Sequence, residues 1–308
     1  MVIETCEHKH SGITVASACR GWCSELIALT RLGVRHTCCF ACDICRKAKA
    51  LSTRTYQHHK WFDNVMDESF LRAPTVDFFF SGFPCQSFST AGLGKGIADL
   101  RGIVVFYVLH YIYRAKPKCF LLENVEGLLT NHKPILVLIL EVIMEMKDAA
   151  GQRLYNVSWK ALDTSQYSGL PHHRVRVFIA GVLAKSQKSD MKWPDPIPMR
   201  PLNDFLEKKQ PEVALNSLAP GYYNHVKTAL TRIINQGDDP FKNQYVVDIS
   251  CSQKRQAHFM KGVSPCLTKN RAASKGHWLT KESRWMTLWV CHSRIFRTGS
   301  FQLLPWAE

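Results

Sequence analysis

The sequence predicts an α/β protein built on an open, doubly wound sheet, followed by a smaller second domain. Two observations carry this prediction. Strand-like runs alternate with helical segments from residue 13 to residue 183, which is the pattern of a sheet whose strands are joined by crossover helices. The chain also has 308 residues, 46% of them hydrophobic, which suffices for one large core or two smaller ones and excludes a disordered chain.

Each predicted strand is a short apolar run, and each predicted helix is a longer segment. The run at Val76–Ser81 is the clearest strand, because its β-branched and aromatic residues are bounded by Pro74 and Gly82. The other predicted strands are Ile13–Ala18, His36–Ala41, Cys119–Leu122, Tyr155–Ala161 and Val175–Val182. The predicted helices are Glu25–Leu32, Leu100–Arg114 and Pro134–Lys147.

The predicted domain boundaries follow from a change in composition after Val182. Residues 185–200 are polar and contain three prolines, as a linker does. We therefore expect a main domain over residues 1–183, a small second domain over 184–262, and a C-terminal segment, 263–308, that packs back on the main domain. Four of the eight tryptophans lie in the last 31 residues, which argues against a loose tail there.

The net charge of +15, from 40 Lys and Arg against 25 Asp and Glu, favours a polyanionic partner such as DNA, RNA or an anionic membrane. The longest apolar stretches, Ile103–Tyr113 and Ile135–Met146, are shorter than the roughly 18 residues of a spanning helix, so we expect no membrane. The chain opens without an apolar signal region, so its 12 cysteines are expected to be reduced. We expect an intracellular monomer, nuclear if the source is eukaryotic.

Candidate catalytic residues follow the predicted strands, because ligands of open α/β sheets bind beyond the carboxyl ends of the strands. Cys85 follows the clearest strand on a turn made by Gly82 and Pro84, where a thiolate could act as a nucleophile. The alternative is a buried structural cysteine. Glu123 follows the apolar run at Cys119–Leu122, where a carboxylate is costly to bury unless it is hydrogen-bonded or functional. Its alternatives are a helix N-cap or a structural ion pair.

Three segments, taken in order, resemble the motif series of C5-cytosine methyltransferases. They are Gly82-Phe83-Pro84-Cys85-Gln86-Ser87-Phe88-Ser89, then Glu123-Asn124-Val125, then Arg174-x-Arg176 before the apolar run Val177–Gly181. The segment Asp99-Leu100-Arg101-Gly102 also resembles the family's segment after its mobile catalytic loop. The likeness covers residues 13–183, with a weaker echo at Ser264-Pro265-Cys266-Leu267-Thr268.

This resemblance implies a Rossmann-like methyltransferase sheet as the catalytic domain over residues 1–183, and a target-recognition domain over 184–262. It implies that the Cys85 thiolate attacks C6 of a cytosine, so that C5 can take a methyl group, while Glu123 holds the base edge. Arg176, with Arg174, would position Cys85, the base or a phosphate. Because C5 and C6 are not reachable within a stacked duplex, the base would be flipped out. Contacts to the nucleic acid are implied for Gln86, Ser87, Ser89 and Arg101.

The methyl donor that the resemblance implies is S-adenosylmethionine. Asp43 stands where an acidic residue would accept the ribose hydroxyls, and Asp63 where a carboxylate would lie near the adenine amine. The other implied cofactor contacts are Gly21, Trp22, Gly82 and Pro84. This sequence also departs from the family pattern. Its first loop keeps one family glycine, Gly21; a histidine, His172, replaces the glutamine expected before the arginine pair; and the final cofactor-pocket motif is not recognisable.

A cysteine cluster, Cys39-x2-Cys42-x2-Cys45 with Cys38 adjacent, raises the possibility of a metal site. Structural zinc normally takes four ligands from two separated pairs, and no second pair is evident. Cys6, His8 and His10 could complete a site, but nothing in the spacing requires it. We therefore expect no metal.

Three functions remain open at this point. Methylation of DNA is favoured because the signature of the tRNA-directed branch is missing, and basic residues spread over 185–277 suit phosphate contacts to a nucleic acid. Methylation of tRNA is the second, but the Cys-Phe-Thr signature usual after Glu-Asn-Val in that branch is missing at Glu126-Gly127-Leu128. The third is a nucleic-acid-binding member of the fold without turnover, which the unrecognisable last motif and the glycine-poor loop suggest.

Overall fold

The computed structural model describes residues 12–56, 58–84, 100–206, 218–249, 257–267, 277–281 and 284–288, and only the backbone at 100, 101, 277, 278, 281 and 284–288. The chain divides into two compact units. The first holds residues 1–162 and 175–193, and the second holds residues 163–174 and 194–308. Within the described ranges, no helix is long and apolar enough to cross a membrane.

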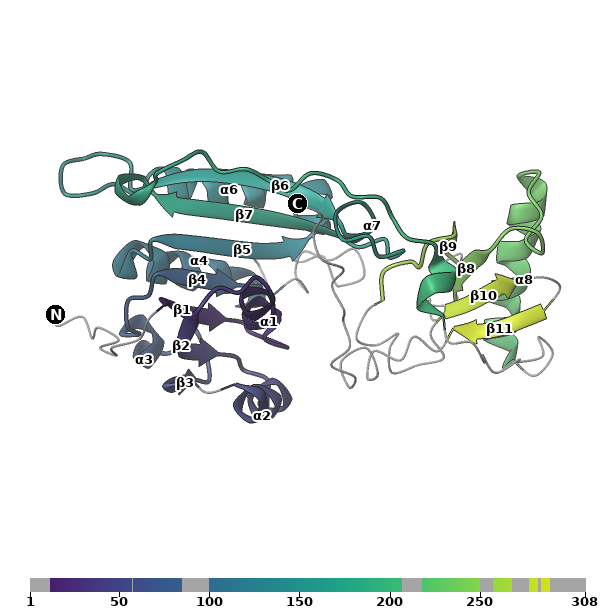
Figure 1. Cartoon of the computed structure of the whole chain (residues 1–308), viewed down its shortest axis with the longest axis horizontal. Helices are drawn as coiled ribbons and strands as arrows, with labels where there is room; N and C mark the ends of the chain where they lie inside the picture. The colour runs from purple at the N-terminus through teal and green to yellow at the C-terminus, as the bar shows by residue number, and fades with distance from the viewer. Residues whose placement is uncertain are drawn as a thin grey trace. The chain divides into compact units, whose positions relative to one another are not determined.

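The first unit is built on a seven-stranded sheet with the strand order β3-β2-β1-β4-β5-β7-β6 (Figure 1). β1 pairs in parallel with β2 and β4, and β5 pairs in parallel with β4 but antiparallel with β7. The bounds are β1 Ile13–Ala18, β2 His36–Cys42, β3 Lys60–Phe62, β4 Phe78–Ser81, β5 Cys119–Val125, β6 Tyr155–Asp163 and β7 Val175–Leu183. The chain order reverses between β1 and β4, and open α/β sheets bind ligands at this switch point. The segments after these two strands therefore lie where a site is expected.

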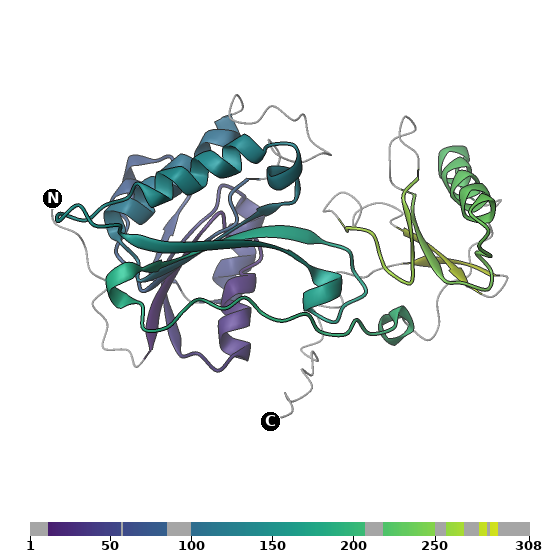
Figure 2. The ribbon, with the colours of Figure 1, turned by 90° about the horizontal axis from the view of Figure 1, so that it is seen from above.

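Helices cover both faces of this sheet, with α1 on one face and α4 and α6 on the other (Figures 1 and 2). Leu26 and Leu29 of α1 share a small core with Val15 of β1. Val108 of α4 and Ile139 of α6 belong to the main core on the opposite face. The helices are α1 Ser24–Arg31, α2 Arg46–Thr55, α3 Glu68–Leu71, α4 Leu100–Ala115, α5 Gly127–Thr130, α6 Lys133–Met144 and the short 3-10 helix η2 Ala184–Ser186.

The strands β4 and β7 show how side chains fill the two faces. Phe79 lies in the main core, whereas Phe78 and Phe80 pack on the α1 side with their rings stacked at a centroid distance of 4.1 Å. Gly181 of β7 stands opposite Phe120 of β5, and a Cβ built on this glycine would lie 2.2 Å from the ring. Any larger residue at position 181 would force that ring to move.

The predicted elements are present, but β5 is longer than predicted and several elements were not predicted, the four-residue helices α3 and α5 among them. The strand predicted over Cys119–Leu122 is too short, because the backbone from Glu123 to Val125 continues to pair with β7. The sequence prediction also omits α2, which is too polar to show an apolar stripe, and β3, which has only three residues. Both follow β2 in the chain, and β3 pairs in parallel with β2 at the edge of the sheet.

The second unit has a sheet of its own, with the order β11-β10-β8-β9, beside the helix α8. Figure 2 shows α8 lying along this sheet, and Val226 and Ala229 of α8 share a core with Val247 of β8. The segment 263–308 is predicted to pack on the main domain. Its strands β10 and β11 instead extend the sheet of the second unit, because β10 pairs with β8 and β11 pairs with β10. The bounds are α7 Thr164–Tyr167, the 3-10 helix η3 Leu202–Phe205, α8 Pro220–Asn235, β8 Tyr245–Asp248, β9 Phe259–Lys261, β10 His277–Lys281 and β11 Arg284–Leu288.

Candidate active site

The turn that leads into Cys85 is held by a buried amide. β4 ends at Ser81, and Phe83 on the following turn is 2% exposed. The Nδ2 atom of Asn124 donates to the Phe83 carbonyl oxygen at 3.3 Å, and its Oδ1 accepts the Val125 N–H at 2.8 Å. Asn124 has no role in the sequence analysis; a buried amide inside an apolar strand is the signal that could have found it. Cys85 itself lies just outside the described residues.

Glu123 and Arg176 are brought together on the neighbouring strands β5 and β7. The Arg176 Nε lies 2.9 Å from Glu123 Oε1, and 34% of the Glu123 side chain is exposed against 14% for Arg176. A Cβ built on Gly82 would lie 3.5 Å from Glu123 Oε2, so the carboxylate borders the turn before Cys85. The structure thus unites Glu123, Arg176 and Gly82 of the predicted site. It also shows the ion pair that was the alternative interpretation of Glu123.

Arg174 has different interaction partners from Arg176. It belongs to the second unit, whereas Arg176 belongs to the first. Its Nη1 lies 3.8 Å from the Cys266 sulfur, and its backbone N–H donates to Asp163 Oδ1 at 2.9 Å. The two arginines of the predicted pair therefore have partners in different units of the chain.

Asp43 fixes the loop between β1 and α1. Its Oδ2 accepts the Gly21 N–H at 2.7 Å, and its Oδ1 accepts the Cys45 N–H at 2.7 Å. The loop can turn towards it because Cys19, Gly21 and Cys23 all have positive φ values, of 54°, 56° and 60°. Each carboxylate oxygen keeps a further lone pair that could accept a ligand hydroxyl.

Two apolar side chains near Asp43 are unusually open to solvent. Trp22 is 66% exposed and Ile44 is 79% exposed. Trp22 is one of the predicted cofactor contacts, whereas sequence reasoning missed Ile44. An apolar residue directly after the predicted ribose-binding acid was the available signal, since small-molecule sites combine apolar walls with a few polar groups.

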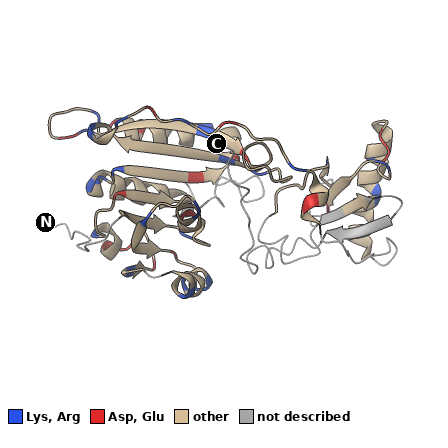
Figure 3. Cartoon of the chain, viewed as in Figure 1, with Lys and Arg blue, Asp and Glu red and all other residues tan. Residues whose placement is uncertain are grey.

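Asp63 follows β3, and its carboxylate accepts hydrogen bonds from two neighbouring side chains. Its Oδ1 accepts from Lys49 Nζ at 2.8 Å and from Trp61 Nε1 at 3.1 Å. Lys49 lies on α2, a strongly basic helix (Figure 3). The hydrogen bond from Lys49 lowers the pKa of Asp63, so the carboxylate is ionised at neutral pH. Any contact with an adenine amine would have to use the lone pairs left free by these partners.

Sequence reasoning missed a buried cluster around Arg20. The Arg20 side chain is fully enclosed, with its Nε 2.9 Å from the Cys23 sulfur and its Nη1 3.1 Å from the Cys38 sulfur. Its Nε also lies 3.6 Å from Glu25 Oε1, and burial raises the pKa of this carboxyl. Arg20 directly precedes Gly21, so the cluster anchors the loop in which family glycines are lacking. The nearby Cys23 was the signal available in the sequence, whereas Cys38 lies 18 residues from Arg20.

Of the cysteines in the Cys39-x2-Cys42-x2-Cys45 pattern, Cys39 and Cys42 lie on the buried strand β2, whereas Cys45 precedes α2. Cys39 and Cys42 are 1% exposed within β2. Burial raises the pKa of the Cys42 thiol and raises that of Cys19 to about 12, so neither is ionised at neutral pH. Among the described residues, no three side chains of the metal-binding types gather into one site.

Several predicted residues lie beyond the described parts of the chain. Of the nucleic-acid contacts, Gln86, Ser87 and Ser89 fall in such a gap, and Arg101 is described only as backbone at the start of α4. Pro84 closes the described part of the turn after β4. The described part of the candidate site therefore consists of the turn after β4, the Glu123–Arg176 pair on β5 and β7, and the loop after β1.

Comparison with known proteins gives a consistent result. A sequence profile of C-5 cytosine-specific DNA methylases matches residues 25–292. The type II methyltransferase M.NgoBV of Neisseria gonorrhoeae is 32% identical over 188 residues, which are 60% of this chain and 43% of that protein. M.BanI of Aneurinibacillus aneurinilyticus is 35% identical over 161 residues, 52% of this chain and 35% of that one. The chain thus spans less than half the length of these relatives.

Solved structures share the fold at low sequence identity. A DNMT2 mutant of Spodoptera frugiperda aligns with a TM-score of 0.50 and 16% identity, over 70% of this chain and 65% of that one. The methyltransferase EhMeth of Entamoeba histolytica aligns with a TM-score of 0.50 and 17% identity, over 72% and 67%. These matches confirm the predicted Rossmann-like methyltransferase sheet. With a profile that covers most of its length, the chain belongs to the C-5 cytosine-specific DNA methylase family.

Proposed function

We propose that this chain transfers a methyl group from S-adenosylmethionine to C5 of cytosine in DNA, through a covalent Cys85 intermediate on a flipped-out base. One observation carries the proposal. The Glu123–Arg176 ion pair borders Gly82, on the turn whose next residues are Phe83, Pro84 and the nucleophile. Family membership and the type II methyltransferase names of the relatives support the same reaction.

The reaction follows from the chemistry of cytosine. Attack of the Cys85 thiolate on C6 forms a carbon–sulfur bond and makes C5 electron-rich, so that C5 can accept a methyl group. When bound, S-adenosylmethionine supplies this methyl group from its sulfonium. A base, for which water suffices, then takes the C5 proton, and the electrons of that bond expel Cys85 as a thiolate. The target must leave the duplex stack for this attack to occur.

Glu123 has the position and the ionic partner needed to bind the cytosine edge. In the proposed roles its carboxylate meets N3 and the exocyclic amine, which favours the protonated, activated ring. Arg176 keeps Glu123 oriented through the 2.9 Å contact. Asn124 holds the Phe83 carbonyl and thereby the turn that presents Cys85.

The residues around Asp43 suit a nucleoside cofactor. Asp43 has free lone pairs for ribose hydroxyls, and the exposed side chains of Trp22 and Ile44 offer apolar surface for an adenine or a ribose. Gly21 and Gly82 leave room on the two neighbouring loops. The remaining proposed contacts are Pro84 and Asp63.

We assign DNA binding to the second unit and to the segment after Cys85. The residues proposed to contact the target strand are Gln86, Ser87, Ser89 and Arg101. Arg174 would contact the base or a phosphate. In this proposal the catalytic domain predicted over residues 1–183 corresponds to the first unit, except for residues 163–174, and the target-recognition domain predicted over 184–262 lies in the second unit from residue 194 onward. Lysines and arginines of the second unit would bind phosphates without reading the sequence.

The test is methyl transfer from radiolabelled S-adenosylmethionine to duplex DNA and, in parallel, to tRNA. Wild type is compared with Cys85→Ser and with the matched control Cys119→Ser, which changes a cysteine at the start of β5. Transfer to DNA that vanishes only in Cys85→Ser supports the proposal. Transfer to tRNA alone would support the RNA alternative, and binding of DNA without transfer at any donor concentration would support a non-catalytic member.

Trapping identifies the nucleophile independently of turnover. DNA that contains 5-fluorocytosine cannot lose a proton from C5, so the covalent adduct should persist. Peptide mapping of the adduct should find the base on Cys85. An adduct on another cysteine would overturn the assignment.

A further inference from the structure

Two segments far apart in the sequence dock on each other inside the second unit. Ser264 donates its N–H to the Pro171 carbonyl oxygen at 2.8 Å, and its own carbonyl oxygen accepts the His173 N–H at 2.9 Å. His172 and Ser264 thereby form a parallel β-bridge. Ser264 is buried, so these bonds are shielded from water. The described part of the segment that weakly resembles the family, 264–267, is thus hydrogen-bonded to the residues just before the arginine pair.

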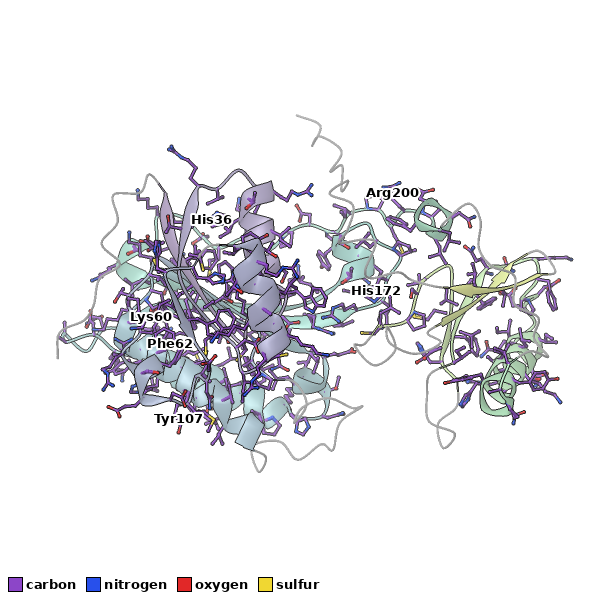
Figure 4. The ribbon with its side chains drawn as sticks, turned by 90° about the horizontal axis from the view of Figure 1, so that it is seen from below. His36, Lys60, Phe62, Tyr107, His172 and Arg200 are labelled. Carbon is purple, nitrogen blue, oxygen red and sulfur yellow. The ribbon has the colours of Figure 1, made fainter. Side chains whose placement is uncertain are left out.

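Side chains extend this contact beyond the bridge. The Nε2 atom of His172, whose side chain is labelled in Figure 4, accepts the Leu267 N–H at 3.2 Å, across 95 residues of sequence. An imidazole can accept there only in its neutral form with the proton on Nδ1. The Arg174 Nη1 approaches the Cys266 sulfur at 3.8 Å. Both residues after Pro265 are therefore contacted from the same short segment, 171–174.

The segment 171–174 is itself fixed by Asp163 at the end of β6. Asp163 Oδ1 accepts the Arg174 N–H at 2.9 Å, and Oδ2 lies 2.7 Å from His173 Nδ1. Thr164 closes the same loop, because its N–H donates to the Arg174 carbonyl oxygen at 3.2 Å. His172 thus projects from a loop that is tied at both ends, and is not a free surface histidine.

We propose that His172 is a positioning residue that holds the segment 264–267 against the loop carrying Arg174. It occupies the position at which a glutamine is expected, and its ring nitrogen supplies the acceptor that a glutamine amide oxygen would offer. The docking stands on the hydrogen bonds alone. Its consequence for catalysis rests on the proposed function: the segment belongs to the unit assigned to DNA, so losing it should weaken the use of DNA.

Hydrogen exchange tests the docking without any activity. Loss of one acceptor should raise the exchange rate of the peptide containing 264–267 by about threefold to tenfold in His172→Leu. His172→Gln restores an acceptor and should exchange like wild type. His258→Leu removes an exposed histidine of the same unit that lies outside the segments 163–174 and 264–267, and should also match wild type. Unchanged exchange in His172→Leu would overturn the proposal; if that variant does not fold, His172→Ala provides the same comparison.

Kinetics then test the consequence. In His172→Leu, kcat/KM for DNA should fall by about threefold to tenfold, mainly through KM for DNA, with KM for S-adenosylmethionine unchanged. His172→Gln should recover the loss. Faster exchange with unchanged use of DNA would overturn the positioning role. An inactive wild type would refute the proposed function instead, while the exchange result would still decide the docking.

Discussion

Two carboxylate–guanidinium pairs in the first unit differ in what surrounds them. Glu123 and Arg176 lie 2.9 Å apart, and 34% and 14% of their side chains remain exposed. Arg20 and Glu25 lie 3.6 Å apart, with 0% and 10% exposed, and two thiols enclose the guanidinium. The first pair can meet a substrate, whereas the second can only hold the protein together. In the proposed function, the same chemical groups therefore serve binding at one place and folding at the other.

Burial decides this difference in physical terms. A partly exposed ion pair contributes little to stability, because water screens it, so its charges remain available to a ligand. A buried pair loses hydration on both partners, and removing one partner leaves an uncompensated charge. The raised pKa of Glu25 is a direct sign of this desolvation. Substitutions in the two pairs should separate turnover from stability.

The largest effect is expected from Glu123→Gln. Glutamine keeps the shape of the side chain but loses the charge that favours a protonated cytosine, so kcat/KM for methyl transfer should fall by about 10²- to 10⁴-fold. The free energy of unfolding should change by about 1 kcal/mol or less, because the pair is partly exposed. Methyl-transfer kinetics and urea unfolding measure the two quantities.

Glu126→Gln is the matched control, since it changes an exposed carboxylate three residues along the chain. It should leave both quantities near wild type. If Glu123→Gln lost stability and kept its turnover, the exposed pair would be structural and the comparison with the Arg20 pair would fail.

Arg20→Met should have the opposite signature. Methionine fills the space but leaves Glu25 without its counter-charge, so the free energy of unfolding should fall by about 3–5 kcal/mol. S-adenosylmethionine should also bind more weakly, because Arg20 anchors the loop that carries Gly21. Equilibrium unfolding and calorimetric titration measure these changes.

The double variant Arg20→Met/Glu25→Leu tests whether the loss of stability comes from the unpaired Glu25 charge. Replacing both members of a buried pair by apolar residues should regain much of the lost stability. A double variant less stable than Arg20→Met would show that Glu25 contributes through something other than this pair.

A smaller effect is expected at the turn that precedes the nucleophile. Asn124→Ala removes the donor to the Phe83 carbonyl and should lower the free energy of unfolding by about 1–3 kcal/mol. Turnover should fall about tenfold, because small displacements of a reacting group are costly. Asn131→Ala, at an exposed amide after α5, is the control. A loss of stability without any loss of turnover would detach Asn124 from the candidate site.

The sequence predicts most strands because each is an apolar run between turn residues, as at Val76–Ser81. It also predicts that Glu123 and Arg176 matter, since both lie in specific motifs. It does not show that they pair with each other, because that contact depends on the antiparallel placement of β7. The Arg20 cluster was hidden for a similar reason: Cys38 reaches it from another strand. The sequence therefore identified several important residues, but it could not predict which of them contact each other after folding.

The smallest effect concerns His58, which lies at the edge of the Arg20 cluster. Its Nε2 lies 3.2 Å from the Ser52 hydroxyl, which in turn contacts the Cys23 sulfur at 3.1 Å. Burial, and then the charge of Arg20, lower the pKa of His58 to about 4. The ring is therefore neutral in the folded protein at a pH where it is largely protonated in the unfolded chain.

The sign of the pH dependence follows from this difference. Between about pH 6.5 and pH 4 the unfolded state binds a proton that the folded state does not, so the free energy of unfolding should fall as the pH falls through this window. Above about pH 6.5 the contribution is fully present. Glu25 acts in the opposite sense, because its raised pKa favours the folded state at low pH. The His58 contribution must therefore be isolated as the difference between wild type and His58→Gln, measured by urea unfolding from pH 4 to pH 7. Because the ring is partly exposed, this difference should be on the order of 1 kcal/mol, and Arg20→Met should reduce it, since the arginine charge is one of its causes. An equal difference at every pH would mean that the buried cluster does not reach as far as His58.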